Sequence, residues 1–263
     1  MSLTFKNLYD YTERNLKRSL GLETLLEARA GMSIDFPGYS RMRPGDYRTA
    51  WFATVFLDIR GSTARAFQIG PQKTFATINA LLPTLARVVD EHGGFVVDYP
   101  GDGIMAHWEL EDISDVLTVK NCIQSCCWMD DAVKSIVNPI LEKYSIPPIT
   151  CGIGAAVGEV VVTKIGIPGY MSAKAIGNSV NLASKYAGKD SNSGEIIIAS
   201  DMSHFAFDDV QPGSQEPIAY RYVANTDSTI KITSQNLKIP RPTREDAQLE
   251  LKNLIQSKLR NSG

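Results

Sequence analysis

Continuous apolar runs and stretches with helical apolar spacing follow one another in the middle of the chain. Trp51–Asp58 is almost wholly apolar and predicts a buried strand. Gln72–Glu91 carries apolar residues three and four positions apart and predicts an amphipathic helix, which Gly93 and Gly94 end. Two further apolar runs flank a Pro-Gly-Asp-Gly turn at residues 100–103 and predict a hairpin. The strands of this hairpin are Phe95–Asp98 and Ile104–Trp108.

The second half of the chain continues this alternation of strands and helices. A long helix is predicted from about Asp112 to Tyr144, ended by the two prolines that follow it. Ile149–Ala156 and Glu159–Ile165 predict a second pair of strands. Three short elements come next: a helix at Ile176–Gly188, a strand at Glu195–Ala199 and a short helix at Asp201–Phe205. The order β-α-β-β-α-β predicts an α+β protein of the ferredoxin-like, split βαβ class.

The two ends of the chain differ from this central part. Residues 1–50 predict an N-terminal extension, with helical spacing first and then a connector rich in Gly, Pro and Arg from Gly31 to Tyr47. Residues 51–206 are predicted to form the main domain. Residues 207–263 are predicted to hold a strand and loop segment and an amphipathic helix that starts near Thr243.

Composition and charge narrow the function classes. The formal net charge of -2 gives no electrostatic reason to expect binding to nucleic acid or to an anionic membrane. No apolar run approaches the roughly 20 residues that a spanning helix needs, so we expect a cytoplasmic protein. The four cysteines form no CxxC pair and the three histidines are scattered, which favours reduced, partly buried thiols over a zinc site.

Two aspartates stand where a metal site could form. Asp58 ends the apolar run of the first strand, and Asp102 lies in the turn of the predicted hairpin. Paired carboxylates beside a loop of small residues are typical of a site for a divalent metal and a triphosphate. Each aspartate also has a simpler explanation, because aspartate is common in turns and at helix caps.

Three segments together resemble the class III nucleotidyl cyclases, the family of adenylyl and guanylyl cyclase catalytic domains. One segment alone would be weak evidence, but the three occur in the family's order. They are Phe56-Leu57-Asp58-Ile59-Arg60-Gly61-Ser62-Thr63, then Glu91-His92-Gly93-Gly94 through Asp98-Tyr99-Pro100-Gly101-Asp102, and Ala175-Ile176-Gly177-Asn178-Ser179-Val180-Asn181-Leu182-Ala183-Ser184-Lys185.

The resemblance implies a reaction and a set of site residues. Two divalent ions per site, Mn²⁺ or Mg²⁺, would be held by Asp58, Asp102 and the backbone carbonyl of Ile59. Backbone amides of a short segment would bind the β- and γ-phosphates, and Asn181 would position the ribose. That segment comprises Arg60, Gly61, Ser62 and Thr63.

Four positions concern the charge that the substrate phosphates would meet. Lys185 stands where the family has an arginine at the α-phosphate, and it keeps the charge without the bidentate fork. It could equally be a solvated helix lysine. Glu159 stands where many members have a phosphate-binding arginine, so Lys164 or Arg221 would have to replace that cation.

The predicted base pocket departs from that of adenylyl cyclases. By resemblance its residues are Asp98 and Lys174, with Phe56 and Ile176 nearby. The two charges are exchanged relative to the adenine-binding pair. An ionised Asp98 cannot donate to N1 of adenine, whereas it can accept the ring N–H of uracil or guanine. The two residues could also be surface charges, or partners in an ion pair.

The exchanged pair argues against ATP and leaves GTP or UTP. A short chain with this pair resembles the bacterial pyrimidine cyclases of anti-phage signalling systems, which favours UTP and cyclic UMP as a second messenger for antiviral defence. That messenger would be sensed by a separate effector. The family also implies a head-to-tail homodimer with active sites at the interface. The alternatives are a guanylate or cytidylate cyclase, a non-catalytic nucleotide-binding sensor, and a plain interaction domain.

Overall fold

The computed structural model describes most of the chain between Thr4 and Ser234. The described residues are 4–22, 42–43, 45–112, 114–167, 170–190, 195–202, 220–225 and 229–234. Most of the predicted connector, the C-terminal helix predicted after Thr243 and the last three residues of the short helix predicted at Asp201–Phe205 lie outside these ranges.

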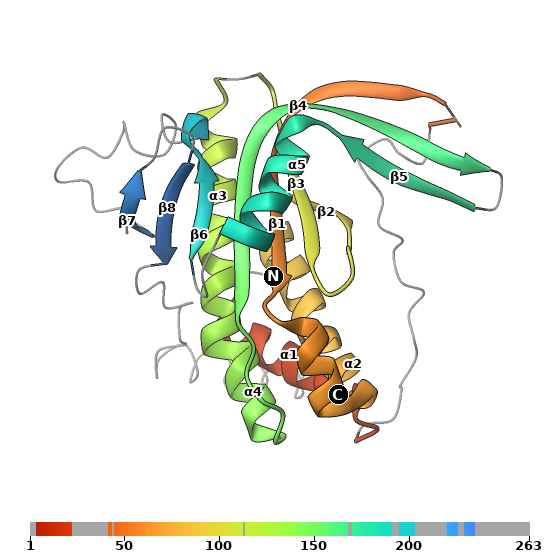
Figure 1. Ribbon diagram of the computed structural model, residues 1–263, viewed down its shortest axis with the longest axis vertical. Coiled ribbons are helices and arrows are strands. Elements are labelled where there is room, and N and C mark those ends of the chain that lie inside the picture. The colour runs from red at the N-terminus through yellow and green to blue at the C-terminus, as the bar shows by residue number, and fades with distance from the viewer. Residues whose placement is uncertain are drawn as a thin grey trace, which may run out of the picture.

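An eight-stranded sheet forms the centre of the described molecule (Figure 1). Its order is β2-β3-β1-β4-β6-β8-β7, and β5 pairs with the far part of β4, which is its C-terminal part, Val161–Ile167. The pairing is antiparallel except between β4 and β6. The strands are β1 (Tyr47–Ile59), β2 (Phe95–Asp98), β3 (Ile104–Leu110), β4 (Cys151–Ile167), β5 (Tyr170–Ile176), β6 (Ile196–Ala199), β7 (Tyr220–Asn225) and β8 (Thr229–Ser234).

The helices connect these strands in the predicted order. They are α1 (Phe5–Ser19), α2 (Ser62–Glu91), α3 (Val116–Ala132), α4 (Asn138–Lys143) and α5 (Asn178–Lys185). A π-helical segment, Val133–Val137, joins α3 to α4, so the long helix predicted after the hairpin is confirmed. With α2 between β1 and β2, and α3 and α4 between β3 and β4, the split βαβ arrangement is also confirmed.

The prediction of two separate strands at Ile149–Ala156 and Glu159–Ile165 is wrong. One strand, β4, runs through both, and its far part pairs with β5 instead. Gly158, at the predicted break, is an ordinary strand residue that packs against α5. A Cβ at this position would lie 3.1 Å from the Cβ atom of Ser179.

Two helices differ from their predicted bounds. The predicted helix at Gln72–Glu91 begins ten residues earlier, at Ser62, because a kink at Gly70 (φ 78°) divides α2 and interrupts its apolar periodicity. The helix predicted from Ile176 begins at Asn178, because Ala175 and Ile176 still pair with β4. Its end continues as a π-helical segment, Tyr186–Asp190.

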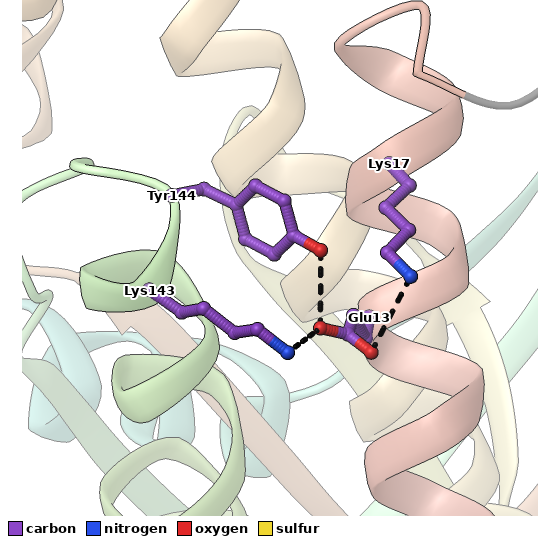
Figure 2. A network of polar contacts seen from close by, with 4 residues as sticks. All are labelled: Glu13, Lys17, Lys143 and Tyr144. Carbon is purple, nitrogen blue, oxygen red and sulfur yellow. Dashed lines mark hydrogen bonds and ion pairs between the residues drawn. The ribbon is translucent and has the colours of Figure 1, made fainter.

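The N-terminal helix α1 packs on the helical layer of the domain. Leu8 and Leu16 are fully buried in the main core. Glu13 accepts hydrogen bonds from Lys143 Nζ (2.6 Å) and the Tyr144 hydroxyl (3.0 Å), and it forms a 3.6 Å ion pair with Lys17 (Figure 2). The two hydrogen bonds link α1 to the end of α4, whereas the ion pair lies within α1.

Alternation along β1 divides the sheet into two faces. Val55 and Leu57 belong to the main core with residues of α2 and α3, whereas Phe52 belongs to a second cluster that includes Val180 of α5. Asp58 shares the parity of Phe52 and therefore lies on the α5 side. Within the described ranges, no helix is both long enough and apolar enough to cross a membrane.

Candidate active site

The end of β1 and the β2–β3 turn meet at one edge of the sheet. Asp58 is the penultimate residue of β1, and Asp102 lies in the turn. Gly103 packs so closely on the end of β1 that a Cβ on it would lie 2.5 Å from the Leu57 carbonyl oxygen and 3.4 Å from Asp58 Oδ1. Only a residue without a side chain brings the turn this near, so the structure brings Asp102, the residue before Gly103, close to Asp58.

The electrostatics of the two carboxylates agree with this geometry. Burial raises the pKa of Asp58, and the negative charge of Asp102 raises it further, whereas Arg60 acts in the opposite direction. A carboxyl group whose pKa is raised by burial and by a neighbouring carboxylate is a common feature of functional sites.

The site fits a divalent cation. The Oδ2 atom of Asp102 is buried and has no hydrogen-bond partner, which is costly for a carboxylate unless a cation satisfies it. In the described part of the chain, no three His, Cys, Asp or Glu residues lie close enough together to hold a metal ion by themselves. Further ligands would therefore have to be backbone carbonyls, such as the one predicted at Ile59, or oxygens of a bound substrate.

The predicted phosphate segment opens α2, but its first amide is already used. The backbone N–H of Arg60 donates to the Thr150 carbonyl at 2.8 Å, so the expectation for this amide is wrong. Gly61 adopts a left-handed conformation (φ 62°) as the N-cap of α2, and no side chain caps the helix there. The amides of Gly61, Ser62 and Thr63 thus remain as candidates at the positive end of a helix.

The two predicted base-reading charges lie together. Lys174 Nζ on β5 is 3.8 Å from Asp98 Oδ2 on β2, and both side chains are about half exposed. The other carboxylate oxygen of Asp98 accepts a 2.8 Å hydrogen bond from the Tyr99 amide. Asp98 pairs with Met105, and Met105 pairs with Phe56, so Asp98 lies on the same sheet face as Asp58. Ile176 ends β5 and is 55% exposed.

The candidate catalytic residues lie on α5. Asn181 and Lys185 are four residues apart, so they share one side of this helix, and both are exposed. Glu159, at the position of the family's phosphate-binding arginine, is also exposed. Lys164 Nζ donates to the Met42 carbonyl at 3.3 Å. The side chain of the other candidate cation, Arg221, lies outside the described residues.

The Arg60 side chain has a position that the sequence did not indicate. Its Nη1 donates to the Gly188 carbonyl, beyond the end of α5, and its guanidinium lies against Gly152 of β4. The signal in the sequence was the pair of glycines 152 and 154 in an apolar strand, which marks a close approach of other groups. The four cysteines are free and buried, as expected for reduced structural thiols.

The comparisons with known proteins agree on one family. A family model described as the adenylate and guanylate cyclase catalytic domain matches residues 47–209. An adenylate cyclase from Anabaena cylindrica is 29% identical over 151 residues, which are 57% of this chain and 30% of that protein. A cytidylate cyclase from Staphylococcus aureus is 21% identical over 234 residues, which are 85% of this chain and 54% of that protein.

A solved structure supports the same fold. The adenylyl cyclase CyaB from P. aeruginosa superimposes with a TM-score of 0.60 at 18% identity, over 73% of this chain and 96% of that one. At this identity the likeness concerns the fold alone. The chain spans between about a third and about half of the length of the two curated relatives above.

Proposed function

This chain belongs to the family of adenylate and guanylate cyclase catalytic domains, and we propose that it converts UTP to cyclic UMP and pyrophosphate. The observation that carries the cyclase activity is the close approach of the β2–β3 turn to Asp58 at the end of β1, together with the buried, unpartnered Oδ2 atom of Asp102 in that turn. The choice of UTP rests on the Asp98–Lys174 pair.

In the proposed reaction the ribose 3′-hydroxyl loses its proton and its oxygen attacks the α-phosphorus. The new bond joins O3′ to the α-phosphorus, the bond from that phosphorus to the bridging oxygen breaks, and pyrophosphate leaves. When bound, two Mn²⁺ or Mg²⁺ ions would supply positive charge that favours loss of the hydroxyl proton to water and offsets the triphosphate charge.

Each residue has a defined part in this scheme. Asp58, Asp102 and the Ile59 carbonyl hold the ions, and the free amides at the start of α2 bind the β- and γ-phosphates. Asn181 orients the ribose through hydrogen bonds. Lys185 offsets negative charge at the α-phosphate, with less geometric control than an arginine would give.

The base preference follows from hydrogen-bond complementarity. Uracil presents its N3–H donor directly beside its O4 acceptor. A carboxylate and an ammonium group only 3.8 Å apart can hydrogen-bond to both positions: Asp98 accepts from N3–H, and Lys174 donates to O4. Adenine offers an acceptor where Asp98 also accepts, so binding ATP would place two acceptors against each other and leave both without a donor.

A cytidylate cyclase is the second candidate, because the Staphylococcus aureus relative with that name aligns over 85% of this chain. Against it, N3 of cytosine is an acceptor and faces Asp98 unfavourably. Guanine shows the same donor and acceptor pattern as uracil, so a guanylate cyclase is the third. A nucleotide-binding sensor without turnover would fit Glu159 and Lys185 but gives no reason for two adjacent aspartates.

The proposal includes a head-to-tail homodimer with the active sites at its interface. In such a dimer the aspartates of one subunit face Asn181 and Lys185 of the other. The paired strands β4 and β5, with the start of β1 beside them, extend beyond the rest of the sheet (Figure 1), and Ile165 and Ile167 on β4 are 50% and 66% exposed. A partner subunit would cover this apolar surface. The product would act as a messenger for antiviral defence, read by a separate effector.

The proposal is tested by turnover of each triphosphate alone. The purified protein is incubated with Mn²⁺ and UTP, CTP, GTP or ATP, and the products are identified by mass spectrometry. We expect cyclic UMP from UTP, and loss of turnover in Asp58→Asn and Asp102→Asn proteins that remain folded. Cyclic AMP as the main product would contradict the proposed role of Asp98 and Lys174 in base selection. If no triphosphate gave a product, the proposal that this chain is a cyclase would be contradicted.

A further inference from the structure

The Arg60 side chain bridges two elements that carry different site residues. Its backbone continues β1 directly after Asp58 and Ile59, whereas its Nη1 donates to the Gly188 carbonyl beyond the end of α5. Its guanidinium covers Gly152, which is the ladder partner of Asp58 on β4. Arg60 therefore reaches from the metal-binding end of β1 to the end of the helix that carries Asn181 and Lys185.

The end of α5 is packed tightly enough for this contact to fix its position. A Cβ on Gly152 would overlap both the Arg60 guanidinium and the Ala187 carbonyl oxygen. A Cβ on Gly154 would overlap the Ala183 carbonyl oxygen and crowd the Tyr186 side chain. Two glycines of β4 thus leave the space in which Arg60 and the last turn of α5 meet.

The chemistry of the contact suits an arginine. Carbonyl groups at the C-terminal end of a helix lack intrahelical donors and carry the negative end of the helix dipole. A guanidinium group offers five N–H donors in a rigid plane, so it can donate to such a carbonyl while its charge stays near Asp58. A lysine at this position would keep the charge but not the planar fork.

We propose that Arg60 is a positioning residue that holds the end of α5, and with it Asn181 and Lys185, against the metal-binding end of β1 in the same chain. This inference rests on the proposed function. In the head-to-tail dimer, the aspartates of one chain serve one active site and its Asn181 and Lys185 serve the other. Arg60 therefore links the two active sites of the dimer mechanically.

The link is tested in a dimer with a single competent site. An Asp58→Ala subunit and an Asn181→Ala subunit, carrying different affinity tags, are combined and the mixed dimer is isolated. Its competent site takes the aspartates from the Asn181→Ala subunit and α5 from the Asp58→Ala subunit. Arg60→Gln is then added to the Asp58→Ala subunit only, where the metal-binding strand is not used.

We expect the single-site kcat to fall about tenfold or more, because small displacements of positioning groups have effects of this size. The matched control is Arg48→Gln in the same subunit. Arg48 lies near the other end of β1 and pairs with Glu109, so its removal leaves α5 in place. An unchanged kcat with Arg60→Gln, beside an active parent dimer, would overturn the link but not the proposed function. An inactive parent dimer would instead contradict the shared sites.

A second readout does not depend on turnover. In the Arg60→Lys homodimer we expect faster amide hydrogen exchange across residues 183–188, with unchanged exchange in the core-packed part of α2 at residues 80–89. Thermal unfolding of the same protein shows whether it remains folded. Unchanged exchange at residues 183–188 would overturn the positioning role, whatever the outcome of the mixed-dimer experiment.

Discussion

Substitution of Gly103 by alanine tests the geometry that brings the two aspartates together. The added Cβ would lie 2.5 Å from the Leu57 carbonyl oxygen, about 0.9 Å short of the 3.4 Å at which ordinary contact begins. Leu57 is fully buried in β1, between β3 and β4, so its carbonyl has little freedom to move. The β2–β3 turn must move instead, and Asp102 moves with it.

The expected losses of stability and activity follow from the size of that overlap. Crowding of this kind costs about 1–3 kcal/mol of stability in a well-packed region. A displacement of about 1 Å between reacting or binding groups can cost about a hundredfold in rate. We therefore expect Gly103→Ala to remain folded and to lose about two orders of magnitude in cyclase activity with Mn²⁺.

The assay measures turnover and urea unfolding on the same preparation. Ile136→Val is the matched control, because it removes one methyl group from a fully buried residue in the helical layer, at a cost of about 0.5–1.5 kcal/mol. This control should keep its activity. If Gly103→Ala is as active as Ile136→Val, the turn does not place Asp102 for function and the reasoning is refuted.

Three further variants test the charges in and around the site. Burial and the charge of Asp102 raise the folded-state pKa of Asp58, so its carboxylate destabilises the metal-free fold above that pKa. In EDTA at neutral pH, the Asp58→Asn protein should therefore have a higher melting temperature than the wild type. This difference in melting temperature should shrink as the pH falls to about 4. A lower melting temperature of the variant at neutral pH would contradict this reasoning. Glu13→Gln removes the ion pair with Lys143 that links α1 to α4 and the ion pair with Lys17 within α1 (Figure 2). It should lower the melting temperature by a few degrees at most without changing base preference, whereas a changed product would show that α1 shapes the site. The double exchange Asp98→Lys with Lys174→Asp should lower kcat/KM for UTP relative to ATP by about tenfold or more, and an unchanged ratio would mean that the two residues form only a surface ion pair.

The regular elements could be predicted because their apolar patterns repeat locally. The strand ending at Asp58, the hairpin around Asp102 and the long helix before β4 were all evident from spacing and turn residues. The missed features depend on contacts between distant segments. Gly158 looks like a break in the sequence, but in the structure it makes room for Ser179 in a continuous strand.

The candidate site was predictable to a similar extent. The resemblance singled out Asp98 and Lys174, and the structure places them 3.8 Å apart, which the spacing of the two residues could not show. The loss of the Arg60 amide from the phosphate segment could not be foreseen, because its acceptor, Thr150, is ninety positions away in the chain. The position of the Arg60 guanidinium likewise depends on the register between β1 and β4.

The most direct measurement of the central claim is a competition between all four nucleoside triphosphates at equal concentration with Mn²⁺. The ratio of cyclic products at low conversion gives the ratio of kcat/KM values in a single sample. The hydrogen-bond pattern of the Asp98–Lys174 pair predicts cyclic UMP as the main product. Cyclic AMP as the main product would contradict the account of this site.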